Sequence, residues 1–420
     1  MAISTTTHFW HPFADMGAVG EAELVVDRGE GVWVFDTDGN RYLDATASLW
    51  YANIGHGRTE VADAVAEQMR RLEAYSTFGD FGNRPANELA ERLAALAPMD
   101  GARVFLGSGG GDAIESAGKI ARRHWVLHGR PERMHLISRT QGYHGTHGFG
   151  TSIGGIEANT SNWGPLIGQV SAVQHDSLEA LEAEILRVRP DRVAAFFCEP
   201  VIGAGGVYPP PEGYIQGAAD LCAEHGVLLV IDSVICGFGR LGTWFGIERW
   251  EDVKPDVITF AKGVTSGYLP LGGVIASAEV AAPFFDGPGS PMLRHGVTYA
   301  GHPTCCAAAL AVLDIYERED LIPRGRELER PLADALAPLA DHPAVSEVRA
   351  GIGLLAAVQL SPDALERDPG AAAKVAAGAR EAGVIVRPLL GALAVSPPLT
   401  VDETHLEQIA DAFRAGLARL

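Results

Sequence analysis

Residues 256–262, Asp256-Val-Ile-Thr-Phe-Ala-Lys262, form an apolar run that ends in a lysine. The run predicts a buried strand, where an ammonium group is costly unless it is paired or neutralised. A lysine that shifts its pKa or forms an imine avoids that cost, which is typical of Schiff-base lysines. An earlier apolar run, Val227-Leu-Leu-Val-Ile-Asp232, ends in the opposite charge. The two strand ends therefore indicate the two halves of a site, with a structural salt bridge across a sheet as the alternative.

Short β-branched runs alternate with amphipathic helices around these two stretches. Strands are predicted at Arg103–Gly107, Met134–Ser138, Val193–Cys198, Val227–Asp232, Val257–Ala261 and Gly272–Ala276. Helices are predicted near Asp112–His128, Leu178–Val188, Gly213–His225 and Pro303–Glu317. This alternation predicts an α/β fold with a mostly parallel sheet that helices cover on both faces. Ligands bind such sheets at the carboxyl ends of the strands, which is where Asp232 and Lys262 fall.

Two flanking segments differ in character from this core. Residues 24–46 contain turn dipeptides between short apolar runs and predict a small meander. The C-terminal part is predicted to contain two strands and a terminal helix, at Gly353–Val358, Val384–Pro388 and Glu403–Leu420. We expect the two ends of the chain to form one small α+β domain beside a large domain, with the segments divided as 1–60, 61–318 and 319–420.

Composition argues against several classes of function. The 420 residues carry a formal net charge of −20, which makes nucleic acids and anionic membranes poor partners. No apolar run is long enough to span a membrane, and the N-terminus lacks the basic and apolar regions of a signal peptide, so we expect a cytoplasmic protein. The five cysteines show no metal-binding spacing, and three lie in apolar runs typical of buried free thiols, so we expect no metal.

A glycine-rich turn follows the first predicted strand. The stretch Leu106-Gly107-Ser108-Gly109-Gly110-Gly111-Asp112-Ala113 leads from that strand into a helix. Consecutive glycines let backbone N–H groups approach a phosphate closely, and a helix N-terminus favours negative charge. The turn matches neither the Walker A nor the dinucleotide-binding pattern, and a plain tight turn is the alternative. A second turn, Gln141-Gly142-Tyr143-His144-Gly145, carries a tyrosine that can stack on a flat ligand.

Together these parts specify one chemistry better than any other. A reactive lysine, an aspartate, an aromatic platform and a phosphate cradle are what a pyridoxal 5'-phosphate (PLP) enzyme needs. The lysine forms the imine, and the carboxylate keeps the pyridine nitrogen protonated so that the ring can accept electrons from a carbanion. We therefore expect PLP as the cofactor, with Lys262 and Asp232 as the catalytic residues.

The sequence also resembles the class III (ω-amino) aminotransferases of PLP fold type I. The resemblance runs over nearly the whole chain, from His8-Phe-Trp-His-Pro-Phe13 to Ser396-Pro-Pro-Leu399. Its motifs are Gly142-Tyr-His-Gly-Thr146, Cys198-Glu-Pro-Val-Ile-Gly-Ala-Gly-Gly206, Asp232-Ser-Val-Ile-Cys-Gly-Phe-Gly-Arg-Leu-Gly242, Ala261-Lys-Gly-Val-Thr-Ser-Gly-Tyr-Leu-Pro-Leu-Gly272 and Thr298-Tyr-Ala-Gly-His-Pro303. The resemblance implies a large PLP-binding domain, whose mostly parallel seven-stranded sheet is sandwiched by helices, and a small α+β domain built from both termini.

Carried over onto this chain, the resemblance implies roles around the cofactor ring. Lys262 would form the imine, and Asp232 would pair with the pyridine nitrogen. Tyr143 would stack on the ring, Val234 would pack on its other face, and Glu199 would lie beside the cofactor.

The resemblance also implies how the phosphate end is bound. Gly109, Gly110 and Gly111 would line the phosphate site, and His144 is also expected to bind the cofactor. Thr298 would reach the phosphate from a second subunit, so we expect a homodimer with a shared active site, alone or within a tetramer. The family usually has a serine where this chain has Gly111, so one hydroxyl donor is missing, and its usual Asp-Glu pair is Asp232-Ser233 here.

Substrate residues are implied by the same resemblance. Trp50 matches a pocket aromatic of amine:pyruvate transaminases, and Phe13, Phe78 and Tyr143 are expected to form an apolar amine pocket with it. Arg387 has the position of a mobile arginine that holds the carboxylate of the acceptor, for which a guanidinium is suited because it pairs with a carboxylate in two parallel bonds. A surface ion pair is the alternative role for Arg387, in which case another arginine, such as Arg240, would hold the carboxylate.

We therefore expect a PLP-dependent transaminase that moves an amino group from an ω-amino acid or amine to a 2-oxo acid such as pyruvate. The expected course is ping-pong chemistry through the lysine Schiff base. A 7,8-diaminopelargonate synthase or another class III aminotransferase or aminomutase is the alternative within the family. A PLP-binding protein without catalysis is the alternative outside it.

Overall fold

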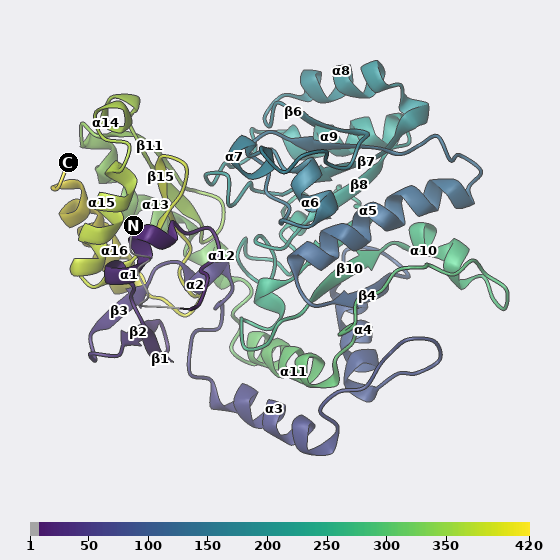
Figure 1. Cartoon of the computed structure of the whole chain (residues 1–420), viewed down its shortest axis with the longest axis horizontal. Helices are drawn as coiled ribbons and strands as arrows, with labels where there is room; N and C mark the ends of the chain where they lie inside the picture. The colour runs from purple at the N-terminus through teal and green to yellow at the C-terminus, as the bar shows by residue number, and fades with distance from the viewer. Residues whose placement is uncertain (1–7) are drawn as a thin grey trace.

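The computed structural model describes residues 8–420 and is built around one seven-stranded sheet (Figure 1). Its strands, in spatial order, are β4 (Arg103–Gly107), β10 (Gly272–Ala276), β9 (Val257–Phe260), β8 (Leu228–Asp232), β7 (Val193–Cys198), β5 (His135–Arg139) and β6 (Val170–Val173). The run from β6 to β9 is parallel, and β10 is antiparallel to both of its neighbours. The predicted mostly parallel sheet is therefore confirmed.

Helices cover both faces of this sheet, which explains why β7 and β8 are buried along their whole length. Alternate strand residues supply two separate apolar cores: Phe196 and Ile231 belong to one, whereas Phe197 and Val230 belong to the other. The first core is closed by α4 (Arg84–Leu96), α8 (Leu178–Val188), α9 (Tyr214–Glu224) and α11 (Pro303–Arg318). The second is closed by α5 (Gly110–Leu127), α6 (Gly148–Ile153) and α10 (Ala278–Phe285).

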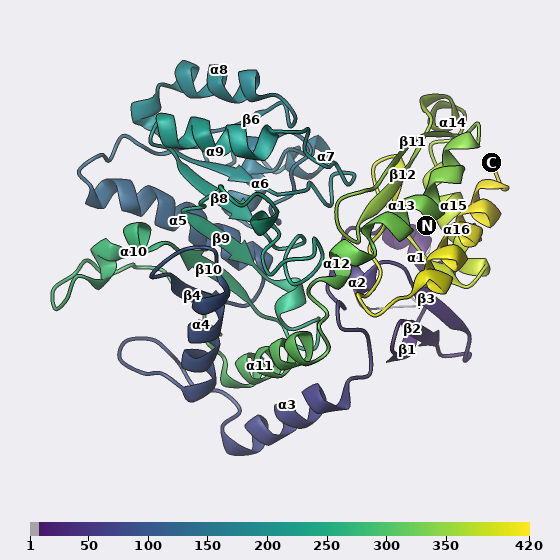
Figure 2. The same cartoon turned by 180° about the vertical axis from the view of Figure 1, so that it is seen from behind.

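Segments from both ends of the chain lie together beside the large sheet (Figures 1 and 2). One small sheet joins the N-terminal strands β1 (Val26–Glu30), β2 (Trp33–Asp36) and β3 (Arg41–Asp44) to the C-terminal strand β13 (Val384–Ile385). A second contains β11 (Val345–Arg349), β12 (Ala356–Leu360), β15 (Ala392–Val395) and β14 (Arg387–Pro388). The two termini therefore share a sheet, while the boundaries at residues 60 and 318 stay predictions.

The remaining helices connect or cover these sheets. They are α1 (Met16–Ala22), α2 (Ala47–Trp50), α3 (Thr59–Arg71), α7 (Glu157–Thr160), α12 (Arg324–Glu327), α13 (Glu329–Leu336), α14 (Pro362–Arg367), α15 (Ala371–Glu381), α16 (Glu403–Leu417), and the 3₁₀ turns η1 (Pro190–Arg192), η2 (Ile247–Arg249), η3 (Lys262–Val264) and η4 (Ala337–Asp341). Over residues 8–420, no helix has the length and apolarity to cross a bilayer. All five cysteines are buried and free.

One predicted strand is wrong in a way that matters for the site. The segment Val384–Pro388 is not a single strand but splits into β13 and β14, which belong to different sheets. The chain leaves the parallel pair with β3 at Ile385 and begins the antiparallel pair with β15 at Arg387. Arg387 therefore begins a new, very short strand, and its side chain lines a pocket.

Candidate active site

Three neighbouring parallel strands deliver three charged side chains to one edge of the sheet. Glu199 follows β7, Asp232 ends β8 and Lys262 follows β9 by two residues. Because parallel strands end at the same edge, their carboxyl ends bring these residues together, and all three line one cavity. The two apolar runs of the sequence are thus adjacent strands, as their charged ends predicted.

Lys262 has the features of a reactive amine. Burial lowers the pKa of its ammonium group, and the nearby Asp232 carboxylate partly offsets that shift. Its backbone has a φ of 48°, in the left-handed region that lysine rarely adopts. Strain of this kind persists where the surrounding structure enforces it, and it is frequent at active sites. Among the described residues, Lys262 has no salt-bridge partner, so its amine is available to a ligand in the cavity.

The Asp232 carboxylate is fixed by hydrogen bonds on both oxygens. Its Oδ1 accepts from the Val234 N–H and from the Thr259 hydroxyl, both at 3.1 Å. Its Oδ2 lies 2.8 Å from Nδ1 of His144, and both side chains are buried. Thr259 is a functional residue that the sequence analysis missed, although a polar residue inside the apolar run of β9 was a usable signal.

Glu199 and Tyr143 complete the wall of this cavity. The Glu199 carboxylate accepts from the backbone N–H groups of Tyr143 and Gly203, each at 3.0 Å. Burial raises the pKa of Glu199, and burial likewise raises the pKa of the Tyr143 phenol. The first of these bonds fixes the backbone of the turn that carries Tyr143 and His144.

The glycine-rich turn contributes an anion cradle to the same cavity. The helix α5 begins at Gly110, and its N-cap residue Gly109 supplies no side-chain cap. The first N–H groups of a helix lack intrahelical partners, so they can bind an anion. A Cβ on Gly109 would meet nothing within 4 Å, whereas a Cβ on Gly110 would lie 3.0 Å from Val234. Open space therefore lies at the uncapped end of the helix, close to Val234.

These residues fit PLP. One cavity is lined by a lysine with a lowered pKa, an aspartate fixed for an acceptor role, an aromatic ring and the first turn of an uncapped helix. These groups suit the aldehyde, the ring nitrogen, the ring face and the phosphate of that cofactor. Among the described residues, no cluster of three or more histidine, cysteine or acidic side chains is arranged to hold a metal ion.

A second cavity adjoins the first, because Tyr143, Ile235 and Lys262 line both. It is mainly apolar, and Trp50, Phe13, Leu49 and Ile156 are among the side chains around it. The predicted aromatic residues Trp50, Phe13 and Tyr143 are therefore brought together. Ile156 and Ile235 were not foreseen, since isolated isoleucines in the sequence carry no signal of a pocket.

Arg387 is the cation of this second cavity. Burial lowers the pKa of its guanidinium, and its Nε is buried without a hydrogen-bond partner within residues 8–420. No carboxylate pairs with it in the same part of the chain. The residue is partly buried, and an unpaired charge there carries a desolvation cost, so its guanidinium is poised to receive an anion.

The alternative arginine is engaged elsewhere. Arg240 is fully buried, and its guanidinium donates to the carbonyl oxygens of Leu354 and Pro397 and to the side chain of Asn53. It does not line the cavity that holds Trp50 and Arg387. The suggestion that Arg240 holds a substrate carboxylate is therefore not supported by its contacts, which are those of a structural residue.

A strained loop holds Trp50 in the pocket wall. Ala47, Ser48 and Trp50 have φ values of 43°, 57° and 67°, all in the left-handed region. The buried carboxylate of Asp44 stabilises this loop, because it accepts from the N–H of Ser48 at 2.6 Å and lies 2.9 Å from Nε2 of His56. Side-chain bonds to a loop of this kind are one way in which a protein maintains an unfavourable backbone.

Three predicted residues line neither cavity: Gly109, which directly precedes the lining residue Gly110, and two residues from another region, Phe78 and Thr298. Phe78 and Thr298 are exposed. The ring of Phe78 packs beside Gly296, where a Cβ would lie 3.1 Å from it. The pair thus occupies one surface region of the chain.

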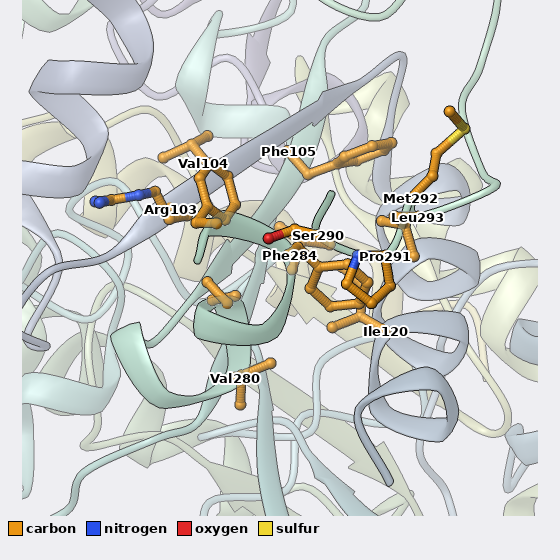
Figure 3. Close-up of a pocket in the computed structure, with 14 residues that line it drawn as sticks. Arg103, Val104, Phe105, Ile120, Val280, Phe284, Ser290, Pro291, Met292 and Leu293 are labelled. Atoms are coloured by element: carbon orange, nitrogen blue, oxygen red, sulfur yellow. The ribbon is translucent and has the colours of Figure 1, made fainter. Parts of the chain in front are cut away.

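A further apolar cavity lies between β4, β10, α5 and α10 (Figure 3). Val104, Phe105, Val280 and Phe284 are among its lining residues. It is lined by no carboxylate, lysine, histidine or cysteine, so it lacks the groups needed for proton transfer or imine chemistry. This cavity is therefore not suited to the chemistry expected around Lys262.

The chain matches known proteins over nearly its whole length. The family model described as Aminotransferase class-III matches residues 16–417. A putrescine–pyruvate aminotransferase of Pseudomonas aeruginosa is 35% identical, over 96% of this chain and 92% of that protein. An adenosylmethionine-8-amino-7-oxononanoate aminotransferase of Nitratidesulfovibrio vulgaris is 35% identical, over 98% of this chain and 80% of that protein. The solved PLP-bound structure of an amine transaminase from an uncultivated Pseudomonas species has a TM-score of 0.93 and 38% identity, covering 98% of this chain and 99% of that one.

These matches confirm the predicted fold type, enzyme class and cofactor. The solved relative contains PLP, and the cavity around Lys262 has the groups which that cofactor requires. The chain belongs to the class III aminotransferases, which are PLP-dependent enzymes.

Proposed function

We propose that this aminotransferase moves an amino group from an amine or ω-amino acid to a 2-oxo acid such as pyruvate. The donor becomes a carbonyl compound and the 2-oxo acid becomes an amino acid, in two half-reactions at one pocket. The observation that carries the proposal is Arg387, an unpaired guanidinium in a mainly apolar cavity that opens onto Lys262. Such a cavity suits a simple amine and, in the other half-reaction, an acid.

Bound PLP supplies an aldehyde that carries the amino group and a ring that withdraws electrons from the reacting carbon. Lys262 would hold the cofactor through its Nζ and would move a proton at that same nitrogen. Its lowered pKa favours the neutral amine that both roles need. Asp232 keeps the ring nitrogen protonated, while His144 and Thr259 orient the carboxylate.

The remaining site residues position the cofactor. Tyr143 and Val234 enclose the ring, and Glu199 fixes the turn that carries Tyr143. Gly109, Gly110 and Gly111 bind the phosphate through the first turn of α5.

Different side chains of the substrate cavity would bind the amine donor and the acid acceptor. Trp50, Phe13 and Leu49 bury the apolar body of an amine donor. Arg387 pairs with the carboxylate of the acceptor, where a planar guanidinium can form two parallel charge-assisted bonds. When a donor without a carboxylate is bound, the guanidinium must turn toward water, and its place on a strand of two residues favours that movement.

The main alternative is a 7,8-diaminopelargonate synthase, because a relative named for that activity is as similar as the putrescine–pyruvate enzyme. Activity with S-adenosylmethionine and 8-amino-7-oxononanoate, in place of simple amines and pyruvate, would favour this alternative. A direct comparison of the two substrate pairs with one enzyme preparation separates the two functions.

We also propose a homodimer whose subunits share their active sites. Thr298 and Phe78 are exposed in one region and line neither cavity of their own chain. In a second copy they would reach the phosphate and the amine pocket, respectively. This arrangement explains why Thr298 and Phe78 are exposed, with the Phe78 ring packed beside Gly296.

The Asp232→Asn variant should keep PLP bound but lose several orders of magnitude in kcat. An amide cannot keep the ring nitrogen protonated, so transition-state stabilisation is lost while most binding contacts remain. Asp256→Asn is the matched control. Asp256 is also a carboxylate, with a pKa raised by burial to about 6, but it lies before β9 and lines neither cavity. Steady-state kinetics on both variants, with PLP content measured by absorbance, test this role. A wild-type kcat in Asp232→Asn would contradict it.

The Arg387→Ala variant should raise KM for pyruvate about tenfold or more, which corresponds to the loss of a charge-assisted bond of roughly 1.5–3 kcal/mol. The half-reaction with an aryl amine that lacks a carboxylate should change little. Single-turnover kinetics measure the two half-reactions separately, with Arg387→Lys as a control that keeps the charge but loses the planar geometry. Equal losses in both half-reactions would mean that Arg387 is structural.

The Thr298→Ala variant should raise the PLP dissociation constant about tenfold, because a hydroxyl donor to a charged group is lost. Thr298→Ser should retain wild-type affinity, since it keeps that donor. Titration of the apo-enzyme with PLP gives the constants, and sedimentation gives the oligomeric state. A fully active monomer, or unchanged PLP affinity in Thr298→Ala, would refute the shared site.

A further inference from the structure

The ring of His147 lies where a side chain on residue 111 would point. A Cβ built on Gly111 would lie 3.1 Å from Cε1 of His147 and 3.2 Å from each of its ring nitrogens. The imidazole therefore occupies the region that a serine side chain at position 111 would enter. Gly111 lies in the first turn of α5 and lines the cavity around Lys262, and the His147 ring lies against that turn.

The backbone is arranged so that His147 can approach this turn. Gly145 has a φ of 85°, and a Cβ there would lie 3.2 Å from the Cα of Gly111. Any side chain at position 145 would therefore separate the loop from α5. The two glycines allow the loop backbone to lie directly against the helix, and His147 follows two residues later.

The side chain of His147 does not cap the helix that follows it. His147 is the N-cap residue of α6, but its side chain makes no capping hydrogen bond. The Glu115 carboxylate of α5 instead accepts from the Phe149 N–H at 2.6 Å. The start of α6 is thus satisfied from the neighbouring helix, and the imidazole of His147 is turned toward Gly111.

The charge environment suits a donor to an anion. Nδ1 of His147 lies 3.6 Å from Oδ1 of Asp112, whose other oxygen accepts from the Ser108 N–H at 2.9 Å. Within residues 8–420, Nε2 of His147 has no hydrogen-bond partner, and the side chain is 50% exposed. The ring is therefore oriented by one carboxylate and retains a second nitrogen for another ligand.

We propose that His147 binds the phosphate of PLP and replaces the hydroxyl donor that Gly111 cannot supply. The free ring nitrogen Nε2 can donate a hydrogen bond to a phosphate oxygen, as a serine hydroxyl at position 111 would. Gly111 and His147 then form one functional pair, since the absence of a side chain at position 111 makes room for the ring. The inference depends on the proposal that the phosphate lies at the start of α5.

Two ligands distinguish a phosphate contact from a structural role. PLP and pyridoxal both carry the aldehyde and the ring, but only PLP carries the phosphate. In His147→Ala, the dissociation constant for PLP should rise about five- to tenfold, whereas that for pyridoxal should stay within twofold of wild type. Thr146→Ala, which changes the exposed neighbour in the same loop, should alter neither constant. Fluorescence titration of the apo-enzyme measures all of these constants without any turnover.

A double substitution tests the pairing of the two residues. Gly111→Ser alone should not tighten PLP binding, because its Cβ would be 3.1 Å from the His147 ring. Gly111→Ser combined with His147→Ala gives the hydroxyl free space, so PLP affinity should return to within about twofold of wild type. The ³¹P resonance of bound PLP should shift in His147→Ala and again in the double variant, since its donors change.

Three outcomes would overturn the proposal. In the first, His147→Ala retains wild-type PLP affinity. In the second, it loses affinity for PLP and pyridoxal equally, which indicates a structural role. In the third, the double variant binds PLP no better than His147→Ala. A wild-type enzyme that fails to aminate pyruvate would instead refute the proposed function and would leave these binding constants interpretable.

Discussion

The burial of the Lys262 amine close to the Asp232 carboxylate is the constraint on which the rest of the structure depends. Three parallel strands must end side by side to bring the lysine, the aspartate and Glu199 to one edge of the sheet. Both β7 and β8 are buried along their whole length, because helices cover both faces of the sheet. Burial in turn lowers the pKa of the lysine, which prepares it to react.

The substrate cavity also contains a basic side chain, Arg387, but its electrostatic surroundings differ from those of Lys262. Lys262 has a carboxylate nearby, whereas Arg387 has none among the residues that the structure describes. A partly buried guanidinium without a carboxylate partner carries a desolvation cost, which an anionic ligand would offset. The strained backbone around Trp50, held by Asp44, is a second cost that the pocket imposes on the fold. Both costs fall where the proposed substrates bind.

Much of the sheet could be predicted from the sequence, because apolar runs that end in turns give an unambiguous signal. The strands that carry Glu199, Asp232 and Lys262 were predicted to within one residue at either end. The edge strand β6, Val170-Ser-Ala-Val173, was missed because four residues with a polar member give little periodicity. The split of Val384–Pro388 into β13 and β14 depends on pairing with strands far away in the sequence. Local composition carries no information on such a break.

The site was predicted partly from strand ends and partly from family resemblance. Asp232 and Lys262 follow from the apolar runs alone, but the support of Asp232 by His144 and Thr259 required the tertiary structure. The contact between Gly111 and His147 likewise depends on the close approach of a loop to the start of α5, which no spacing in the sequence reveals. The roles proposed for Thr298 and Phe78 would depend on a second copy of the chain.

Covalent attachment of the cofactor to Lys262 is the central claim, and peptide mapping after borohydride reduction of the PLP-bound enzyme tests it most directly. Reduction makes the bond between the cofactor and the lysine permanent, so mass spectrometry can locate it. We predict one phosphopyridoxyl group per chain, on the peptide that contains Lys262. A label on Lys119, Lys254 or Lys374 in place of Lys262, or no label on a PLP-saturated enzyme, would contradict the account.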